Sequence, residues 1–190
     1  MSQHRLRLIA VISMVIQALA FGTSSQALAR QNRYNSASLA GRPAPDIPAI
    51  TSKGMAEKVS MKATLATLLY VVAPRTESCV ENRENIKKLW DSQRHKFRFI
   101  GLSLRPGEFG TDDCTRDMPF ALFRAVDYHA PALRTYGFGA VPALYLISKD
   151  GVIERAWGGV LEGAARKDAE TFFGVDLPGP VRKSSVVERR

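Results

Sequence analysis

An almost unbroken apolar run, Thr67 to Ala73, is the clearest pattern in the chain. A run of this length without alternation is typical of a β-strand that is covered on both faces. Glu77 to Trp90 follows with apolar residues mostly at helical spacing, which predicts a helix. Phe97 to Leu104 is rich in Phe, Ile and Leu and predicts a second central strand. A strand, a helix and a strand in this order predict a parallel, right-handed crossover unit.

The middle of the chain interrupts this pattern. Arg105 to Gly110 contains one proline and two glycines, which end the second strand. Thr111-Asp112-Asp113 supplies a helix cap, so Cys114 is expected in the first turn of a short helix that reaches about Phe123. Asp127 to Tyr136 predicts another short helix.

The last third of the chain predicts a hairpin and a closing helix. Two apolar runs, Ala143 to Ile147 and Val152 to Trp157, flank Lys149-Asp150-Gly151, and Asp-Gly is a strong hairpin signal. Leu161 to Phe173 predicts the closing helix. Residues 177–190 are expected to form a loose, basic tail.

The chain begins with a pattern typical of a secretory signal peptide, predicted at residues 1–29. Arg5 and Arg7 form a basic start, Leu8 to Gly22 is apolar, and Ala27-Leu28-Ala29 is a small-residue cleavage site. The apolar stretch is shorter than the roughly 20 residues of a membrane-spanning helix, which favours cleavage over an uncleaved anchor. The sequence therefore predicts an extracytoplasmic protein, periplasmic or secreted, with no stable membrane insertion after cleavage.

Removing 29 of 190 residues leaves 161, enough for one domain with a full-sized core. A flexible lead-in is predicted at residues 30–38, and an extended, proline-stiffened entry at Gly41 to Asp46 leads to a short strand near Ile47 to Ile50. Without the signal the chain has 25 basic and 18 acidic residues, a net charge of +7. The basic residues are scattered singly except in the tail, which favours a solvated surface over a nucleic-acid site.

Cys79 falls at the predicted junction between the first central strand and its helix. A helix N-terminus carries partial positive charge and unpaired N–H groups, which stabilise a reactive thiolate. Arg75 adds a second cation nearby. The alternative is a small apolar residue packed under the sheet, since free cysteines are often buried. In an oxidising compartment a disulfide between the chain's two cysteines, Cys79 and Cys114, could persist.

Three segments together resemble the redoxin branch of the thioredoxin superfamily, which holds the TlpA-like thiol-disulfide oxidoreductases and the AhpC/TSA peroxiredoxins. They are the entry Gly41 to Asp46, the strand-Cys79-helix junction, and Tyr136 to Gly151. The resemblance covers nearly the whole mature chain and places the domain at residues 39–176. It implies an α/β fold, a thioredoxin-like three-layer sandwich with a mixed central sheet and flanking helices.

The chain departs from both groups of this branch. A TlpA-like reductase would carry Trp-Cys-x-x-Cys, but Arg75 and Thr76 occupy the first two positions, and a dithiol cycle cannot run through the motif alone. Thr-x-x-Cys resembles the peroxidatic motif, in which the Thr76 hydroxyl would bind peroxide and Cys79 would become a sulfenic acid. Peroxiredoxins usually have a proline four residues before the threonine, whereas Pro74 is two before it. They also have an arginine where Val141 stands, and Arg75 is the candidate to replace it.

The resemblance also implies roles for residues outside this motif. In atypical two-cysteine thiol peroxidases the resolving cysteine follows the second central strand, at a spacing close to that from Cys79 to Cys114. The alternative for Cys114 is a residue with no redox role. Val141-Pro142 resembles the cis-proline of the fold, which lies beside the active-site thiol and offers backbone groups to an extended substrate.

The sequence therefore predicts an exported, peroxiredoxin-like oxidoreductase in which Cys79 reduces peroxides or exchanges protein disulfides. An extracytoplasmic thiol reductant would be its electron donor. Two alternatives stay open: a thiol-disulfide exchange protein of TlpA type, and a degenerate thioredoxin-fold module that binds a partner without turnover. No metal or cofactor is implied, because His95 and His129 lack ligand spacing.

Overall fold

The computed structural model describes residues 38–73, 76–104, 114, 115, 117–127, 131–138 and 140–181. The predicted signal peptide, most of the predicted lead-in, Arg75 and the predicted helix cap at residues 111–113 lie outside this part. The elements are β1 Ile47–Thr51, β2 Ala56–Val59, β3 Thr67–Val72, α2 Glu77–Gln93, β4 Arg98–Ser103, β5 Ala121–Ala125, α3 Pro131–Arg134, β6 Ala143–Ile147, β7 Ile153–Gly158 and α4 Gly163–Phe173.

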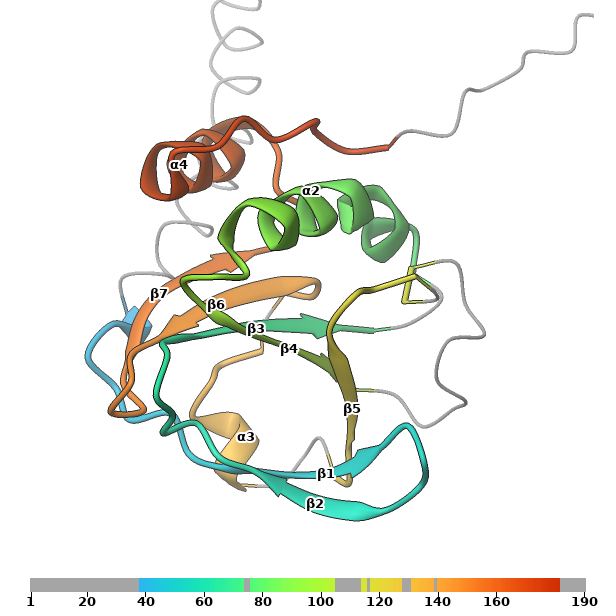
Figure 1. Ribbon diagram of the computed structural model, residues 1–190, viewed down its shortest axis with the longest axis vertical. Coiled ribbons are helices and arrows are strands. Elements are labelled where there is room, and N and C mark those ends of the chain that lie inside the picture. The colour runs from blue at the N-terminus through green and yellow to red at the C-terminus, as the bar shows by residue number, and fades with distance from the viewer. Residues whose placement is uncertain are drawn as a thin grey trace, which may run out of the picture. The chain divides into compact units, whose positions relative to one another are not determined.

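The strands form one mixed sheet in the order β2-β1-β5-β4-β3-β6-β7. β4 runs parallel to both β3 and β5, whereas β6 runs antiparallel to both β3 and β7. Helices α2 and α4 lie on one side of the β3–β6 region, and α3 lies on the other (Figure 1). This is the predicted α/β arrangement of helices around a mixed sheet.

Alternate residues of β3 face two separate hydrophobic cores. Leu68, Tyr70 and Val72 belong to the core under α2, and Leu69 and Val71 belong to the core on the α3 side. All six residues of β3 are buried. Coverage on both faces explains why this strand is a continuous apolar run and not an alternating one.

Several predicted elements are confirmed. β3, α2 and β4 form the expected parallel crossover unit. β6 and β7 form the expected hairpin around Gly151, whose φ of 77° suits a residue without Cβ. The closing helix α4 ends at Gly174, which takes the left-handed conformation that favours glycine.

The predicted helix from Cys114 to about Phe123 is wrong. Cys114 lies in a turn, and residues 121–125 form β5, which pairs with β4 and β1. Leu122 packs against the core under α2 while Phe123 packs on the opposite side, as alternation along a strand requires. Gly101 of β4 permits this, because a Cβ there would collide with the Leu122 side chain. In the described part of the predicted helix at residues 127–136, the single turn α3 is formed.

The predicted loose tail is wrong for its first residues. Leu177 is buried, and its backbone N–H donates to Glu170 Oε1 at 3.0 Å. The Gly179 N–H donates to Asn85 Oδ1 of α2 at 2.8 Å. These contacts join residues far apart in sequence, so local composition does not reveal them. Residues 182–190 lie outside the described part.

Strand β2 was not predicted. Of its four residues only Val59 is buried, and the others, including Glu57 and Lys58, are exposed. It forms one edge of the sheet, where charged residues protect against pairing with other chains. An edge strand with one buried residue has no apolar alternation to detect.

Candidate active site

Cys79 lies in the first turn of α2, as predicted. The helix starts at Glu77, and Thr76 before it has an extended backbone with φ −96° and ψ 143°. The Cys79 side chain is 0% exposed and faces the sheet. The structure therefore combines the two interpretations of the sequence, because Cys79 is at a helix N-terminus and is also buried.

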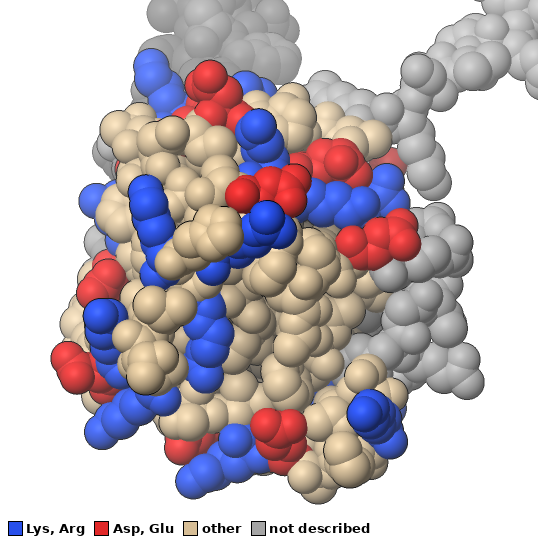
Figure 2. Space-filling view, in the orientation of Figure 1, with Lys and Arg blue, Asp and Glu red and all other residues tan. Residues whose placement is uncertain are grey.

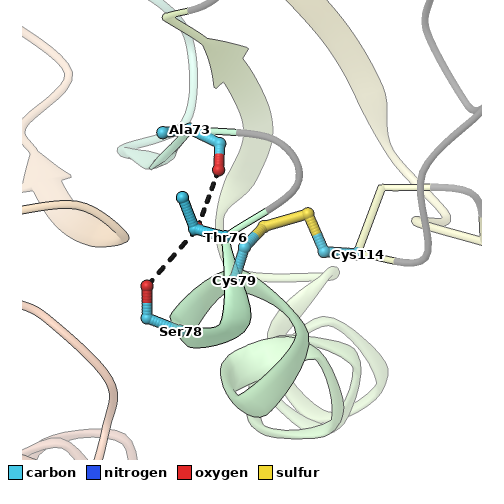
Figure 3. Close-up of a disulfide and its surroundings, with 5 residues drawn as sticks. All are labelled: Ala73, Thr76, Ser78, Cys79 and Cys114. Carbon is cyan, nitrogen blue, oxygen red and sulfur yellow. Dashed lines mark hydrogen bonds between the residues drawn. A yellow bond between two sulfur atoms is a disulfide. The ribbon is translucent and has the colours of Figure 1, made fainter.

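Cys79 is bonded to Cys114 in a disulfide, with the two Cα atoms 5.5 Å apart (Figure 3). Cys114 is 1% exposed and belongs to the same core. The bond joins the start of α2 to the segment between β4 and β5, across 35 residues of sequence. In this oxidised state neither cysteine titrates or acts as a nucleophile.

The Thr76 hydroxyl is engaged within the turn between β3 and α2. It donates to the Ala73 carbonyl oxygen at 2.8 Å and accepts from Ser78 Oγ at 3.4 Å. It makes no side-chain cap of α2. The side chain of Cys79 points away from Ser78 and toward Cys114 (Figure 3). Because the Thr76 hydroxyl donates its hydrogen bond to Ala73, it is not free to donate to another group in the oxidised state.

The Val141–Pro142 peptide bond is cis, which confirms the predicted conformation of this bond. Pro142 directly precedes β6, and the β6–β3 register pairs Ala143 with Val71. Pro142 thus lies at the end of β3 from which the chain continues to Cys79. Pro142 is buried, and its carbonyl oxygen accepts from the Gly159 N–H at 2.7 Å. The start of α2 and the cis-proline therefore lie at the same end of β3.

Buried amide side chains extend the sheet-facing side of α2 beyond Cys79. Asn82 Oδ1 accepts from the Leu161 N–H at 3.0 Å and from Asn85 Nδ2 at 3.2 Å. Asn85 Nδ2 also donates to the Leu161 carbonyl oxygen at 3.1 Å. These two asparagines were not predicted from the sequence. Their signal is the spacing of three from Cys79 to Asn82 and from Asn82 to Asn85, which places all three side chains on one helix face.

Tyr70 of β3 contributes a buried hydroxyl to the same core. The residue is 1% exposed, and its hydroxyl has no hydrogen-bond partner among the described residues. Burial raises the pKa of Tyr70 far above its ordinary value, and the neighbouring Asn82 side chain opposes this shift. Tyr70 is therefore a neutral hydrogen-bond donor at any physiological pH.

Charges of both signs lie side by side on one face of the molecule. Figure 2 shows Lys and Arg interspersed with Asp and Glu on the face that it displays. Some of them pair, as Arg166 does with Glu170 at 2.7 Å and Arg83 with Glu84 at 2.9 Å. Within the described residues, no group of three His, Cys, Asp or Glu side chains is arranged to hold a metal ion. No helix of that same part is long and apolar enough to cross a membrane.

No protein-family model matches the chain, and no curated protein matches it. Solved structures match it over most of their own length. A protein from Chlorobium tepidum described as the thiol:disulfide interchange protein DsbE has 20% identity, covers 70% of this chain and 94% of its own, and has a TM-score of 0.55. The thioredoxin domain of a thiol-disulfide oxidoreductase from Bacteroides vulgatus has 17% identity, coverage of 70% and 97%, and a TM-score of 0.54. A protein from Bacteroides thetaiotaomicron described as a protein disulfide isomerase has 15% identity, coverage of 73% and 89%, and a TM-score of 0.57.

The chain has a thioredoxin-like fold. The resemblance inferred from the sequence is thereby confirmed at the level of the fold, whereas its peroxiredoxin part stays a prediction. In this thioredoxin-like fold the structure brings Thr76, Cys79 and Cys114 together, at the same sheet edge as Pro142. Arg75, the predicted second cation, lies outside the described residues.

Proposed function

We propose that this protein is an exported thiol-based oxidoreductase, with Cys79 as the redox-active thiol and Cys114 as its resolving partner. The observation that carries the proposal is the disulfide itself, which joins the chain's two cysteines at the N-terminus of α2. A helix N-terminus stabilises the thiolate that forms when the bond is reduced. The signal-peptide pattern of residues 1–29 supports an oxidising, extracytoplasmic location.

The reductive half of the cycle consumes the disulfide. A thiolate of a reducing partner attacks one sulfur, a mixed disulfide forms and the other sulfur leaves as a thiolate. A second thiol of the partner then releases the mixed disulfide. The partner gives up two electrons and becomes a disulfide, and Cys79 and Cys114 each gain a proton or remain as thiolates. The names of the structurally similar proteins support thiol exchange as this half-reaction.

The oxidative half uses a peroxide, ROOH. The Cys79 thiolate attacks the terminal oxygen, the S–O bond forms as the O–O bond breaks, and ROH leaves after taking up a proton. Cys79 is then a sulfenic acid. The Cys114 thiol attacks its sulfur, the disulfide forms and water leaves. Thr76 supports this half-reaction through the Thr-x-x-Cys pattern, provided that its hydroxyl turns from Ala73 toward the peroxide after reduction.

A second candidate is a non-catalytic thioredoxin-like module whose disulfide is structural. The burial of both cysteines favours it, because Cys79 is 0% and Cys114 1% exposed. A partner thiol must reach one sulfur, so exchange requires the start of α2 or the segment that carries Cys114 to open locally. A structural disulfide requires no such opening.

Reduction under native conditions separates the two candidates. Purified protein is held in buffers of graded dithiothreitol potential, the free thiols are blocked, and intact mass gives the reduced fraction. We expect reversible reduction without unfolding. Reduced protein given one equivalent of peroxide should recover the disulfide, and Cys114→Ser should stop at a sulfenic acid on Cys79. A disulfide that is reduced only after the protein unfolds would leave the structural module as the better account.

A further inference from the structure

Tyr70 is the strongest unexplained polar feature of the described structure. It lies in the middle of β3, paired with Gly101 on one side and Leu144 on the other. Its side chain points into the core that contains the disulfide, and the residue is 1% exposed. A buried hydroxyl without a partner lowers stability, so such a group calls for a reason.

Two other buried tyrosines among the described residues have hydroxyls with a clear structural role. The Tyr136 hydroxyl donates to the Pro45 carbonyl oxygen at 2.6 Å, and the Tyr145 hydroxyl donates to the Tyr136 carbonyl oxygen at 3.0 Å. Both belong to the core on the α3 side. Only in the core with the disulfide does a described tyrosine hydroxyl lack an acceptor.

Tyr70 and Cys79 belong to the same buried core under α2. The polar side chain that interacts with the Tyr70 hydroxyl is Asn82, three residues after Cys79 and on the same face of α2. Side chains at this spacing are neighbours on a helix. Asn82 Oδ1 already accepts two hydrogen bonds, from the Leu161 N–H and from Asn85 Nδ2. Asn82 opposes the rise in the pKa of Tyr70, so it acts on the hydroxyl oxygen as a donor and leaves the hydroxyl proton without an acceptor. Cys79 is one helical turn from Asn82 along α2.

We propose that Tyr70 is a positioning residue of the redox site, whose hydroxyl donates a hydrogen bond to the Cys79 sulfur once the disulfide is reduced. The inference rests on the proposed function, because it assigns the hydroxyl a partner in the reduced state only. A thiolate is a much better acceptor than a disulfide sulfur, since a charged acceptor strengthens a hydrogen bond. The unpaired hydroxyl of the oxidised state thus favours reduction.

The effect of Tyr70→Phe has a definite sign. The variant loses nothing in the oxidised state, where the hydroxyl is unpaired, and loses a hydrogen bond in the reduced state. Its reduction potential should therefore be more negative than that of the wild type. We expect the equilibrium with dithiothreitol to shift about tenfold toward the disulfide form, which is about 30 mV for a two-electron couple.

Tyr145→Phe is the matched control, because it removes an equally buried hydroxyl from the other core. It should lower the unfolding midpoint and leave the reduction potential unchanged. Tyr70→Phe should make the reduction potential more negative and should leave the oxidised form at least as stable as the wild type. A spectroscopic measurement needs no variant: reduction of the wild type should shift tyrosine absorbance, and Tyr70→Phe should abolish that shift.

The proposed function and the role of Tyr70 can fail independently. Reversible reduction of the wild type tests the function alone, and a disulfide that resists reduction in the folded protein would overturn both. A reversible couple whose potential and tyrosine absorbance are the same in the wild type and in Tyr70→Phe would overturn the role of Tyr70 and leave the function standing.

Discussion

The two faces of the sheet satisfy their buried polar groups in different ways. On the α3 side the hydroxyls of Tyr136 and Tyr145 donate to backbone carbonyl oxygens. Under α2 lie the disulfide, the paired amides Asn82 and Asn85, and the unpaired hydroxyl of Tyr70. The tyrosine hydroxyls of one core are thus satisfied, while the other core combines a disulfide with a hydroxyl that has no acceptor in the oxidised state.

The core under α2 is also held by contacts between distant parts of the chain. The disulfide, the amides of α2 and the segment after α4 connect residues 35 to 94 positions apart. Loss of one such contact should loosen the α2 side selectively.

Removing the disulfide should have the largest effect. The double variant Cys79→Ala/Cys114→Ala frees a loop of 35 residues, for which the chain-entropy model gives a loss of about 3 to 4 kcal/mol in the free energy of unfolding. Urea unfolding of the oxidised wild type and the variant measures this loss. Hydrogen exchange should rise in α2 and stay low in β1. Equal increases on both faces would contradict the asymmetry.

Asn85→Ala should be the next most harmful. The change leaves the Gly179 N–H and the Leu161 carbonyl oxygen without their partner, at a cost of about 2 to 3 kcal/mol. Limited proteolysis should then cut near residue 179 faster than in the wild type. Ser92→Ala is the control, since that exposed hydroxyl bonds only to its own helix, and it should stay within about 0.5 kcal/mol.

Tyr145→Phe should cost about 1 kcal/mol, because it removes one buried hydrogen bond and leaves the Tyr136 carbonyl oxygen unpaired. Tyr70→Phe in the oxidised protein should cost nothing, because the hydroxyl has no acceptor to lose. Thermal unfolding of both variants gives the comparison directly. Equal losses of stability would mean that the two hydroxyls play the same structural role.

The smallest effect should come from Asp46 at the entry to β1. The Met61 N–H donates to Asp46 Oδ1 at 3.0 Å, and this bond, together with Lys58 at 3.4 Å, lowers the pKa of Asp46. A carboxylate with a lowered pKa adds stability above its unfolded pKa of about 4 and loses that stability as pH falls further. The wild type should therefore lose up to about 1 kcal/mol more than Asp46→Asn between pH 5 and pH 2. The same dependence of stability on pH in the wild type and in Asp46→Asn would show that the ionised Asp46 contributes nothing to stability.

Much of the fold followed from the sequence because local patterns specify it. The continuous run of β3, the helical spacing of α2 and the Asp-Gly turn each depend on neighbouring residues. The position of Cys79 at the start of α2 followed from the same patterns. Strand β5 was mistaken for a helix because its pairing with β4 depends on the space beside Gly101, which belongs to a strand 20 residues earlier.

The sequence by itself determined β3, α2, β4, the β6–β7 hairpin and α4, the place of Cys79 and, through the family resemblance, the cis conformation before Pro142. Only the tertiary structure decided that Cys79 is bonded to Cys114, that Asn85 binds the segment after α4, and that the Tyr70 hydroxyl is left unpaired. Secondary structure depends on contacts a few residues apart, which a sequence displays directly. Disulfide pairing and the satisfaction of buried polar groups depend on which distant segments meet, and that is fixed only when the two cores pack.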